Sequence, residues 1–289
     1  MNEEDFPALY CAADSASNKV QAQLLLSYKV NAGLLIAGAA TALVSTMTTW
    51  LAVIAAILFI ASLLVYIHSQ HRNFQGCWYQ ARALAESVKT ATWRLMMSAE
   101  PFSTNNNESN LTAFRNLLKE LLQENRGIGE HLSGDWSKQD QVTHYMQKIL
   151  ASTFEEKKQC YLKHRIESQR AWYARRAKEN KADSSKFFIL LCVAYAVAIV
   201  LLLIRIAAPE VPFLPVDVLA VIAASIIGWK QLRRFDELAS AYGLTAHEVG
   251  IIQSRYDIVT DKASLCAFVS DAENAFSREH TQWAARRDH

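Results

Sequence analysis

The pattern of apolar and polar positions is dominated by one long apolar run. Val30–His71 holds 42 residues without a single Asp, Glu, Lys or Arg. A hydrocarbon core of about 30 Å takes roughly 20 apolar helical residues to cross, so this run is too long for one span and long enough for two. Its most polar part, Ser45–Trp50, lies near the middle and ends in a tryptophan, a residue typical of membrane interfaces. The pattern predicts spans at 30–46 and 51–68, joined by a short turn.

A second apolar pair follows at 187–207 and 213–229. Pro209, Pro212 and Pro215 place the turn of this pair, because proline interrupts a helix interior. The start of the chain, Met1–Asp5, is acidic and lacks the positive region of a signal peptide, so we expect the first span to be a retained anchor. The sequence therefore predicts four transmembrane helices in two hairpins.

The segments between the apolar pairs have helical periodicity. Apolar residues recur at spacings of three and four in 72–100 and 109–125, which indicates two amphipathic helices. Residues 135–208 contain neither Gly nor Pro, and we predict a long helix over 140–182 that either continues into the third span or breaks at Asp183–Ser185. At about 1.5 Å per residue it would reach roughly 60 Å, so its apolar face must be covered by other helices of this chain or of a partner.

Two further helices complete the prediction. One runs from Trp229 to Tyr242 and is capped by Gly243, and the other is a terminal helix with Phe268, Ala272, Phe276 and Trp283 on one face. The order helix, two spans, two helices occurs twice along the chain. We therefore predict an all-α membrane protein whose long cytoplasmic helices form a bundle, with one unit over 1–130 and a second over 135–289.

Basic residues are concentrated on one side of the spans, since the first predicted turn has no charge and the second has only Arg205 against Glu210 and Asp217. Neither predicted hairpin turn has a basic excess, whereas Lys or Arg lies near all four opposite ends. The positive-inside rule then places both termini and the large soluble segments in the cytoplasm. The basic run 165–186 favours an anchor that contacts anionic lipid over a nucleotide-binding site. The juxtamembrane basic residues around the second hairpin are Arg170, Arg175, Arg176, Lys178, Lys181, Lys186, Lys230, Arg233 and Arg234.

Small residues recur along the spans at helical spacing, and they let helix backbones approach closely in lipid. They are Gly33, Ala37, Thr41, Ser45, Ala52, Ala56, Ala220, Ala224 and Gly228. Tight packing of helices within one protomer is the simpler interpretation, and a pore lining is the alternative. No span interior holds a clear charge, which argues against a coupled transporter.

The sequence offers little that indicates catalysis. We find no phosphate-binding glycine loop, nucleophile motif or zinc signature, and therefore expect neither an enzyme nor a bound cofactor or metal. His68 and His71 lack a third ligand nearby, which favours an interfacial role. Asp271, Glu273, Glu279 and His280 suggest acid–base work less readily than a charged, salt-bridged helix face. Five scattered cysteines fit a reducing compartment, and a net charge of +2 gives no reason to expect nucleic acid as a partner.

Three segments resemble the SLATT family. They are Arg165–Tyr173 (RIESQRAWY), Phe235–Tyr242 (FDELASAY) and Phe268–Trp283 (FVSDAENAFSREHTQW), and Cys77–Lys89 with Trp93 looks like part of a second such unit. The resemblance implies a prokaryotic two-span effector, here in tandem, of the kind associated with nucleotide-signalled antiviral conflict systems and thought to perforate the inner membrane. The family defines no catalytic residues.

The leading expectation is an inner-membrane effector that assembles as a homo-oligomer and forms a pore or disrupts the membrane on a signal from an upstream sensor or nucleotide-signalling partner. The alternative is a membrane-anchored scaffold whose cytoplasmic helices recruit partner proteins. Both expectations include membrane lipid as a partner.

Overall fold

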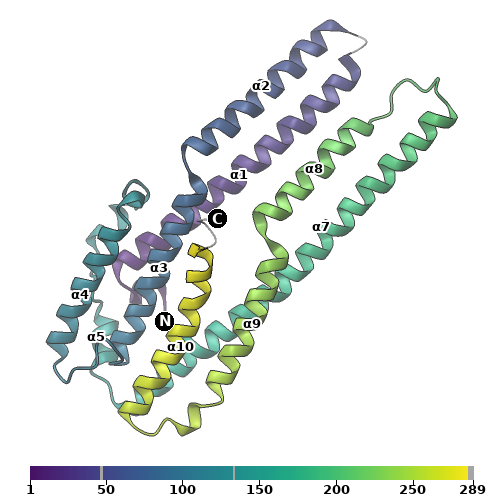
Figure 1. Ribbon diagram of the computed structural model, residues 1–289. Helices are drawn as coiled ribbons and strands as arrows, with labels where there is room; N and C mark the ends of the chain where they lie inside the picture. The colour runs from purple at the N-terminus through teal and green to yellow at the C-terminus, as the bar shows by residue number, and fades with distance from the viewer. Residues whose placement is uncertain (46–47, 133, 286–289) are drawn as a thin grey trace. The chain divides into compact units, whose positions relative to one another are not determined.

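The computed structural model describes residues 1–45, 48–132 and 134–285, and every regular element within them is helical. This confirms the predicted all-α class (Figure 1). The main helices are α1 (Ala8–Val44), α2 (Thr49–His71), α3 (Phe74–Met96), α4 (Asn107–Glu124), α5 (His144–Leu150), α6 (Phe154–Tyr161), α7 (Ser168–Ala207), α8 (Val216–Arg233), α9 (Phe235–Gln253) and α10 (Lys262–Ala285). Short turns are η1 (Glu3–Asp5), η3 (Arg126–His131), η4 (Gly134–Lys138), η5 (Leu162–Glu167) and η6 (Tyr256–Ile258).

The chain divides into two compact units that do not follow the order of the sequence. The bundle unit consists of 1–21, 75–176 and 240–289, and the apolar unit consists of 22–74 and 177–239. Helices α1, α7 and α9 each contribute residues to both units. Each half of the sequence therefore supplies part of each unit.

The apolar unit contains two helical hairpins. The part of α1 after residue 21 runs antiparallel to α2, and the part of α7 after residue 176 runs antiparallel to α8 (Figure 1). Large apolar side chains such as Leu64, Ile189 and Ile206 are more than half exposed on these helices. Water disfavours exposed apolar surface of this extent, and lipid accepts it. Part of the predicted first turn, at residues 46 and 47, lies outside the described residues.

Three helical runs are long and apolar enough to cross a membrane. They are α1, Thr49–Met96 with α2 and α3, and Phe154–Ala207, which ends in α7. The predicted fourth span is not confirmed, because α8 begins only at Val216 and its 18 residues include Asp217, Lys230 and Arg233. Eighteen helical residues reach about 27 Å, slightly less than the hydrocarbon core.

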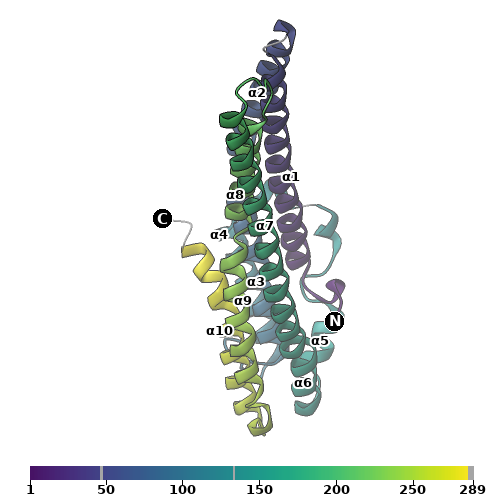
Figure 2. The same cartoon turned by 90° about the vertical axis from the view of Figure 1, so that its right-hand side faces the viewer.

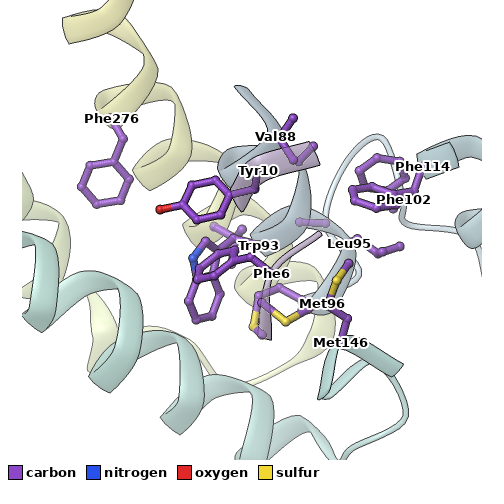
Figure 3. Packing of buried hydrophobic residues seen from close by; sticks show 14 of the residues in the cluster. Phe6, Tyr10, Val88, Trp93, Leu95, Met96, Phe102, Phe114, Met146 and Phe276 are labelled. Carbon is purple, nitrogen blue, oxygen red and sulfur yellow. The ribbon is translucent and has the colours of Figure 1, made fainter. Parts of the chain in front are cut away.

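The core of the bundle unit is built on α3. Ala81, Ala85 and Val88 recur at helical spacing and are fully buried, as the amphipathic pattern predicts. Trp93 and Met96 continue this face into a cluster that also contains Phe6 and Tyr10 near the start of the chain (Figure 3). The N-terminal segment that contains Phe6 and Tyr10 thus packs in the core of this unit.

The predicted long helix over 140–182 is wrong near its start, and from Phe154 onward the chain is helical as predicted. The chain breaks at Ala151–Thr153 between α5 and α6, and a π-helical turn, η5, then precedes α7. Thr153 begins α6 with a capping box, in which its hydroxyl accepts from the amide of Glu156 while the Glu156 carboxylate accepts from the amide of Thr153. This reciprocal cap competes with continuation of the preceding helix. Beyond η5, α7 runs through Asp183–Ser185 without interruption.

The helix predicted from Trp229 to Gly243 is also divided differently. Arg234 adopts a left-handed backbone conformation (φ 50°) and separates α8 from α9. Helix α9 then continues through Gly243 to Gln253. An added Cβ at Gly243 would meet no heavy atom within 4 Å, so this glycine neither ends the helix nor marks a close contact.

Candidate functional site

A carboxylate buried in the bundle unit is the most unusual polar group of the described chain. Glu273 of α10 is 0% exposed and accepts four hydrogen bonds. Arg165 donates two of them, from Nε to Oε1 at 2.8 Å and from Nη2 to Oε2 at 2.6 Å. Tyr161 Oη and Thr90 Oγ1 each donate one at 2.9 Å. The four donors satisfy a charge that would otherwise be costly to bury.

Arg165 comes from the π-helical turn η5 and is 1% exposed. A π-helical turn widens the backbone locally and occurs often at functional sites. The guanidinium carbon lies 4.4 Å from the ring centroid of Phe276, one turn beyond Glu273 on α10. Burial disfavours the charged guanidinium, but the Glu273 carboxylate outweighs this effect and raises the pKa of Arg165 above its ordinary value. The Arg165 guanidinium therefore carries its positive charge at any physiological pH.

Tyr161 and Thr90 join further elements to this pair. Tyr161 is the last residue of α6 and is completely buried, with its ring edge-on to Trp93 at 5.6 Å between centroids. Burial and the neighbouring Glu273 carboxylate raise the pKa of the Tyr161 phenol well above its ordinary value. Thr90 belongs to α3. One carboxylate on α10 is thus bound by α3, α6 and η5.

A second group of charges extends the network along α3. Arg82 contacts Glu86 at 2.7 Å and Asp14 of α1 at 3.3 Å. The side-chain oxygen of Gln169 on α7 faces two donors. It accepts from Arg165 Nη1 at 2.9 Å and from Lys89 Nζ at 3.1 Å. Burial lowers the pKa of Lys89. Lys89 Nζ also lies 4.0 Å from Glu86 Oε2, so the two groups of charges are linked through Gln169 and Lys89.

The arrangement holds helices together and offers no chemistry to a substrate. Both oxygens of Glu273 are saturated with donors, and neither Glu273 nor Arg165 is accessible to solvent. General acid–base catalysis requires a group within reach of a bound substrate. Among the described residues, no three His, Cys, Asp or Glu side chains are grouped to hold a metal ion. The ion pair and its neighbours therefore join α10 to α3, α6 and η5.

A tight contact in the apolar unit joins its two hairpins. Tyr28 Oη on α1 donates to the backbone oxygen of Ser225 on α8 at 2.7 Å, and its ring lies 5.7 Å from that of Trp229 between centroids. Lys29 Nζ lies 5.5 Å from the centroid of the same indole. A Cβ added at Gly228 would collide with the Tyr28 hydroxyl. A larger residue at 228 would therefore have to displace the Tyr28 hydroxyl; Figure 2 shows α1 and α8 in the turned view.

The other predicted small residues lie mostly elsewhere. Six of them are exposed: Gly33, Ala37, Ala52, Ala56, Ala220 and Ala224. Thr41 and Ser45 are half-buried, and their hydroxyls donate to the backbone oxygens of Ala37 and Ala42. Neighbouring positions make the contacts within the unit: Gly38 lies against Phe59, and Ala55 and Ala223 are buried. Of the predicted set, Gly228 alone occupies a close contact among the described residues.

The predicted basic residues divide between the two units. Arg170, Arg175 and Arg176 belong to the bundle unit, and the other six belong to the apolar unit. There, Lys230 lies 3.7 Å from Asp236, Arg234 lies 2.7 Å from Glu237, and Arg233 lies over the rings of Trp229 and Phe235. Basic side chains beside aromatic rings are typical of a membrane interface. His68 lies edge-on to Phe74 at 6.3 Å between centroids.

The sequence prediction missed the buried network. It placed Asp271 and Glu273 together on a charged face, whereas Asp271 pairs with Arg255 at 2.7 Å in solvent and Glu273 is buried. The sequence analysis did not predict Tyr161, Arg165 or Thr90 as partners of this carboxylate. A usable signal was present, because Val269, Ala272 and Phe276 place position 273 at the edge of the apolar face of α10.

Comparison with protein families found two matches. Residues 7–158 match SMODS and SLOG-associating 2TM effector domain 3, and residues 161–283 match SMODS and SLOG-associating 2TM effector domain 1. Neither the curated proteins nor the solved structures gave a match. The two matched segments lie in tandem and together cover nearly all of the chain.

Proposed function

The chain belongs to the SLATT family of SMODS- and SLOG-associating two-transmembrane effectors, and from its two tandem domains we propose an oligomeric effector that perforates or otherwise disrupts the inner membrane of a prokaryote. SLATT domains are linked to membrane effector roles in conflict systems. The observation that carries the proposal is the apolar unit, whose long helices expose large apolar side chains suited to lipid. We place the protein in antiviral defence, downstream of a sensor or nucleotide-signalling partner.

In this proposal α8 is the fourth span. Its uncharged stretch, 218–229, is short, but Asp217 lies at one end and Lys230 and Arg233 at the other. Long basic side chains can reach the interface while their stems stay in the apolar layer. With basic residues near the same end of each hairpin, both termini are cytoplasmic. Reporter fusions at residues 48 and 212 should then read as periplasmic, and fusions at 105 and 289 as cytoplasmic; a cytoplasmic signal at 48 contradicts this orientation.

Self-association is supported by apolar surface outside the apolar unit. On α9, Leu244 is 71% and Ile251 is 68% exposed, and the two lie seven residues apart on one side of the helix. Exposed apolar side chains at this spacing are suited to pairing with another helix. The exposed small residues of the spans offer a second surface for close helix contacts in lipid. We propose a symmetric homo-oligomer, because a path for ions is more readily formed between protomers than through one close-packed protomer.

Opening is proposed to depend on the bundle unit. Helices α1 and α7 run without interruption from this unit into the apolar unit, so they are suited to carry a movement between the two. The Arg165–Glu273 pair fixes α10 against α3, α6 and η5 and so favours a closed resting state. The chain needs no catalytic activity in this scheme.

The proposal is tested by inducing the full chain and a variant truncated from Ser264 in cells, and by measuring entry of a membrane-impermeant dye. We expect truncation to change dye entry while the protein stays in the membrane fraction. Membrane localisation with no dye entry for either chain, under any partner or signal supplied, would favour the scaffold function instead.

A further inference from the structure

An open groove lies between α1 and α2 in the apolar unit. It has a volume of about 380 Å³ and is lined by Leu26, Ser27, Val30, Leu64, Val65 and His68. Four of these side chains are aliphatic, and Ser27 and His68 supply the polar atoms of the lining. Pockets that bind small molecules have volumes of roughly 300–1,000 Å³ and combine an apolar wall with a few polar groups. The groove has both properties.

The polar atoms of the groove lie at one end. Helix α1 ends and α2 begins at the same end of their hairpin (Figure 1). Ser27 lies farther from that end than Val30 does, and His68 lies farther from it than Leu64 does. The run without Asp, Glu, Lys or Arg begins at Val30 and ends at His71. The polar end of the groove is therefore at the edge of the apolar run, and its aliphatic end lies within the run.

Contacts on both sides of the groove hold its walls in place. Beyond Val30, Ser62 Oγ on α2 donates to Asn31 Oδ1 on α1 at 2.6 Å, and Ser62 is buried. A hydrogen bond of this kind stabilises the association of two helices in lipid. At the polar end, the ring of His68 packs against that of Phe74, which is buried. The groove is therefore formed before any ligand binds.

The charge near the polar end favours an anionic occupant. No Asp or Glu occurs between Asp14 and Glu86, so the segment that forms this hairpin has only basic formal charges. Lys29 lies on α1 close to the polar end in sequence. Arg72 follows α2, and its amide donates to the backbone oxygen of His68, one turn earlier, at 3.1 Å. Basic groups at the cytoplasmic edge of transmembrane helices attract anionic lipid headgroups.

We propose that this groove binds one acyl chain of an anionic phospholipid, with the phosphate at the polar end. The chain lies against Val30 and Leu64. The Ser27 hydroxyl and the His68 imidazole offer hydrogen-bond donors to the phosphate oxygens, and Arg72 supplies a positive charge. The inference rests on the proposed placement of this hairpin in the membrane. It does not rest on pore formation, because lipid binding is measured on the resting protein.

Native mass spectrometry of the full chain, freed of lipid in detergent, tests the charge preference. The chain is titrated with phosphatidylglycerol and with phosphatidylcholine of the same acyl chains. We expect one saturable phosphatidylglycerol per protomer, bound about fivefold more tightly than phosphatidylcholine because of the basic charge near its phosphate. Arg72→Gln should remove this preference. Arg115→Gln makes the same change in net charge at an exposed position of α4 and should keep it.

Leu64→Trp tests the aliphatic end. The indole should occupy the groove and weaken phosphatidylglycerol binding about fivefold or more, since the acyl chain loses its van der Waals contacts there. Leu63→Trp is the matched control, because Leu63 precedes Leu64 on α2, is 56% against 60% exposed and does not line the groove. It should bind as the parent does. Val30→Trp blocks the groove from α1 and keeps the test valid if Leu64→Trp does not fold.

Weaker binding in a groove variant with binding unchanged in Leu63→Trp supports the site. Absence of saturable binding, equal affinities of the parent for the two lipids, or a preference that survives Arg72→Gln would overturn the proposal. An equal effect of Leu64→Trp and Leu63→Trp would overturn it as well. A chain that binds phosphatidylglycerol as expected but gives no current across a bilayer keeps the lipid site and contradicts pore formation alone.

Discussion

Replacing Glu273 by glutamine should destabilise the bundle unit strongly. Glutamine keeps the size of the side chain but removes the charge that faces Arg165, which is 1% exposed. The guanidinium would then be buried without a counter-ion, and removal of one partner of a buried pair costs about 3–5 kcal/mol. For a unit of this size, about 2–4 °C per kcal/mol converts the loss to a fall in melting temperature of roughly 6–20 °C.

Asp271 offers a matched control two residues earlier on the same helix. Its contact with Arg255 is 2.7 Å long, close to the 2.6 Å of the buried pair, but the two side chains are 49% and 50% exposed. An exposed pair contributes about 0–1 kcal/mol, so Asp271→Asn should lower the melting temperature by at most about 4 °C.

The assay is thermal unfolding of the full chain in detergent, followed by circular dichroism. The double variant Arg165→Met with Glu273→Met should be less destabilised than either single variant, because it leaves no buried charge. Equal melting temperatures for Glu273→Gln and Asp271→Asn would refute the reasoning that burial sets the strength of the Arg165–Glu273 pair.

Three further predictions concern other parts of the chain. Gly228→Ala should lower stability by about 1–3 kcal/mol through its collision with the Tyr28 hydroxyl, and Tyr28→Phe in the same chain should recover part of the loss in thermal unfolding. Leu244→Glu or Ile251→Glu should change stability by less than about 0.5 kcal/mol, since both positions are exposed, yet lower the assembly mass in detergent; an unchanged mass would remove α9 from the interface. Because the pKa of Lys157 is about 8 when folded and 10.5 is its ordinary value, the unfolded chain binds more protons between these values. The melting temperature of the parent should therefore rise relative to Lys157→Gln as pH increases from 8 to 10, and parallel pH profiles would contradict this.

The sequence predicts the helices better than their junctions. Apolar spacing correctly places Ala81, Ala85 and Val88 in the core, and it places Phe268 and Phe276 on the buried face of α10, because both patterns depend only on helical periodicity. The break before α6 depends on a local cap at Thr153, whose signal in the sequence is short and was not used.

The buried network is harder to predict, since its members are distant in sequence. Arg165 and Glu273 are separated by 108 residues, and the guanidinium reaches the carboxylate from a π-helical turn that no periodic pattern indicates. A charged residue at the edge of an apolar helix face can signal burial but cannot identify its partner. The contact of Gly228 with Tyr28 is similar: small-residue spacing identifies the glycine and not the side chain that occupies the space beside it.

Single-channel conductance across a planar bilayer tests the proposed function most directly. The parent, Glu273→Gln and Asp271→Asn are reconstituted at equal protein density, confirmed by recovery from the bilayer. A membrane effector held closed by the buried pair should give discrete current steps that are rare for the parent and for Asp271→Asn and frequent for Glu273→Gln. Absence of current from all three incorporated proteins would contradict pore formation, and equal step frequencies in all three would contradict control by the Arg165–Glu273 pair.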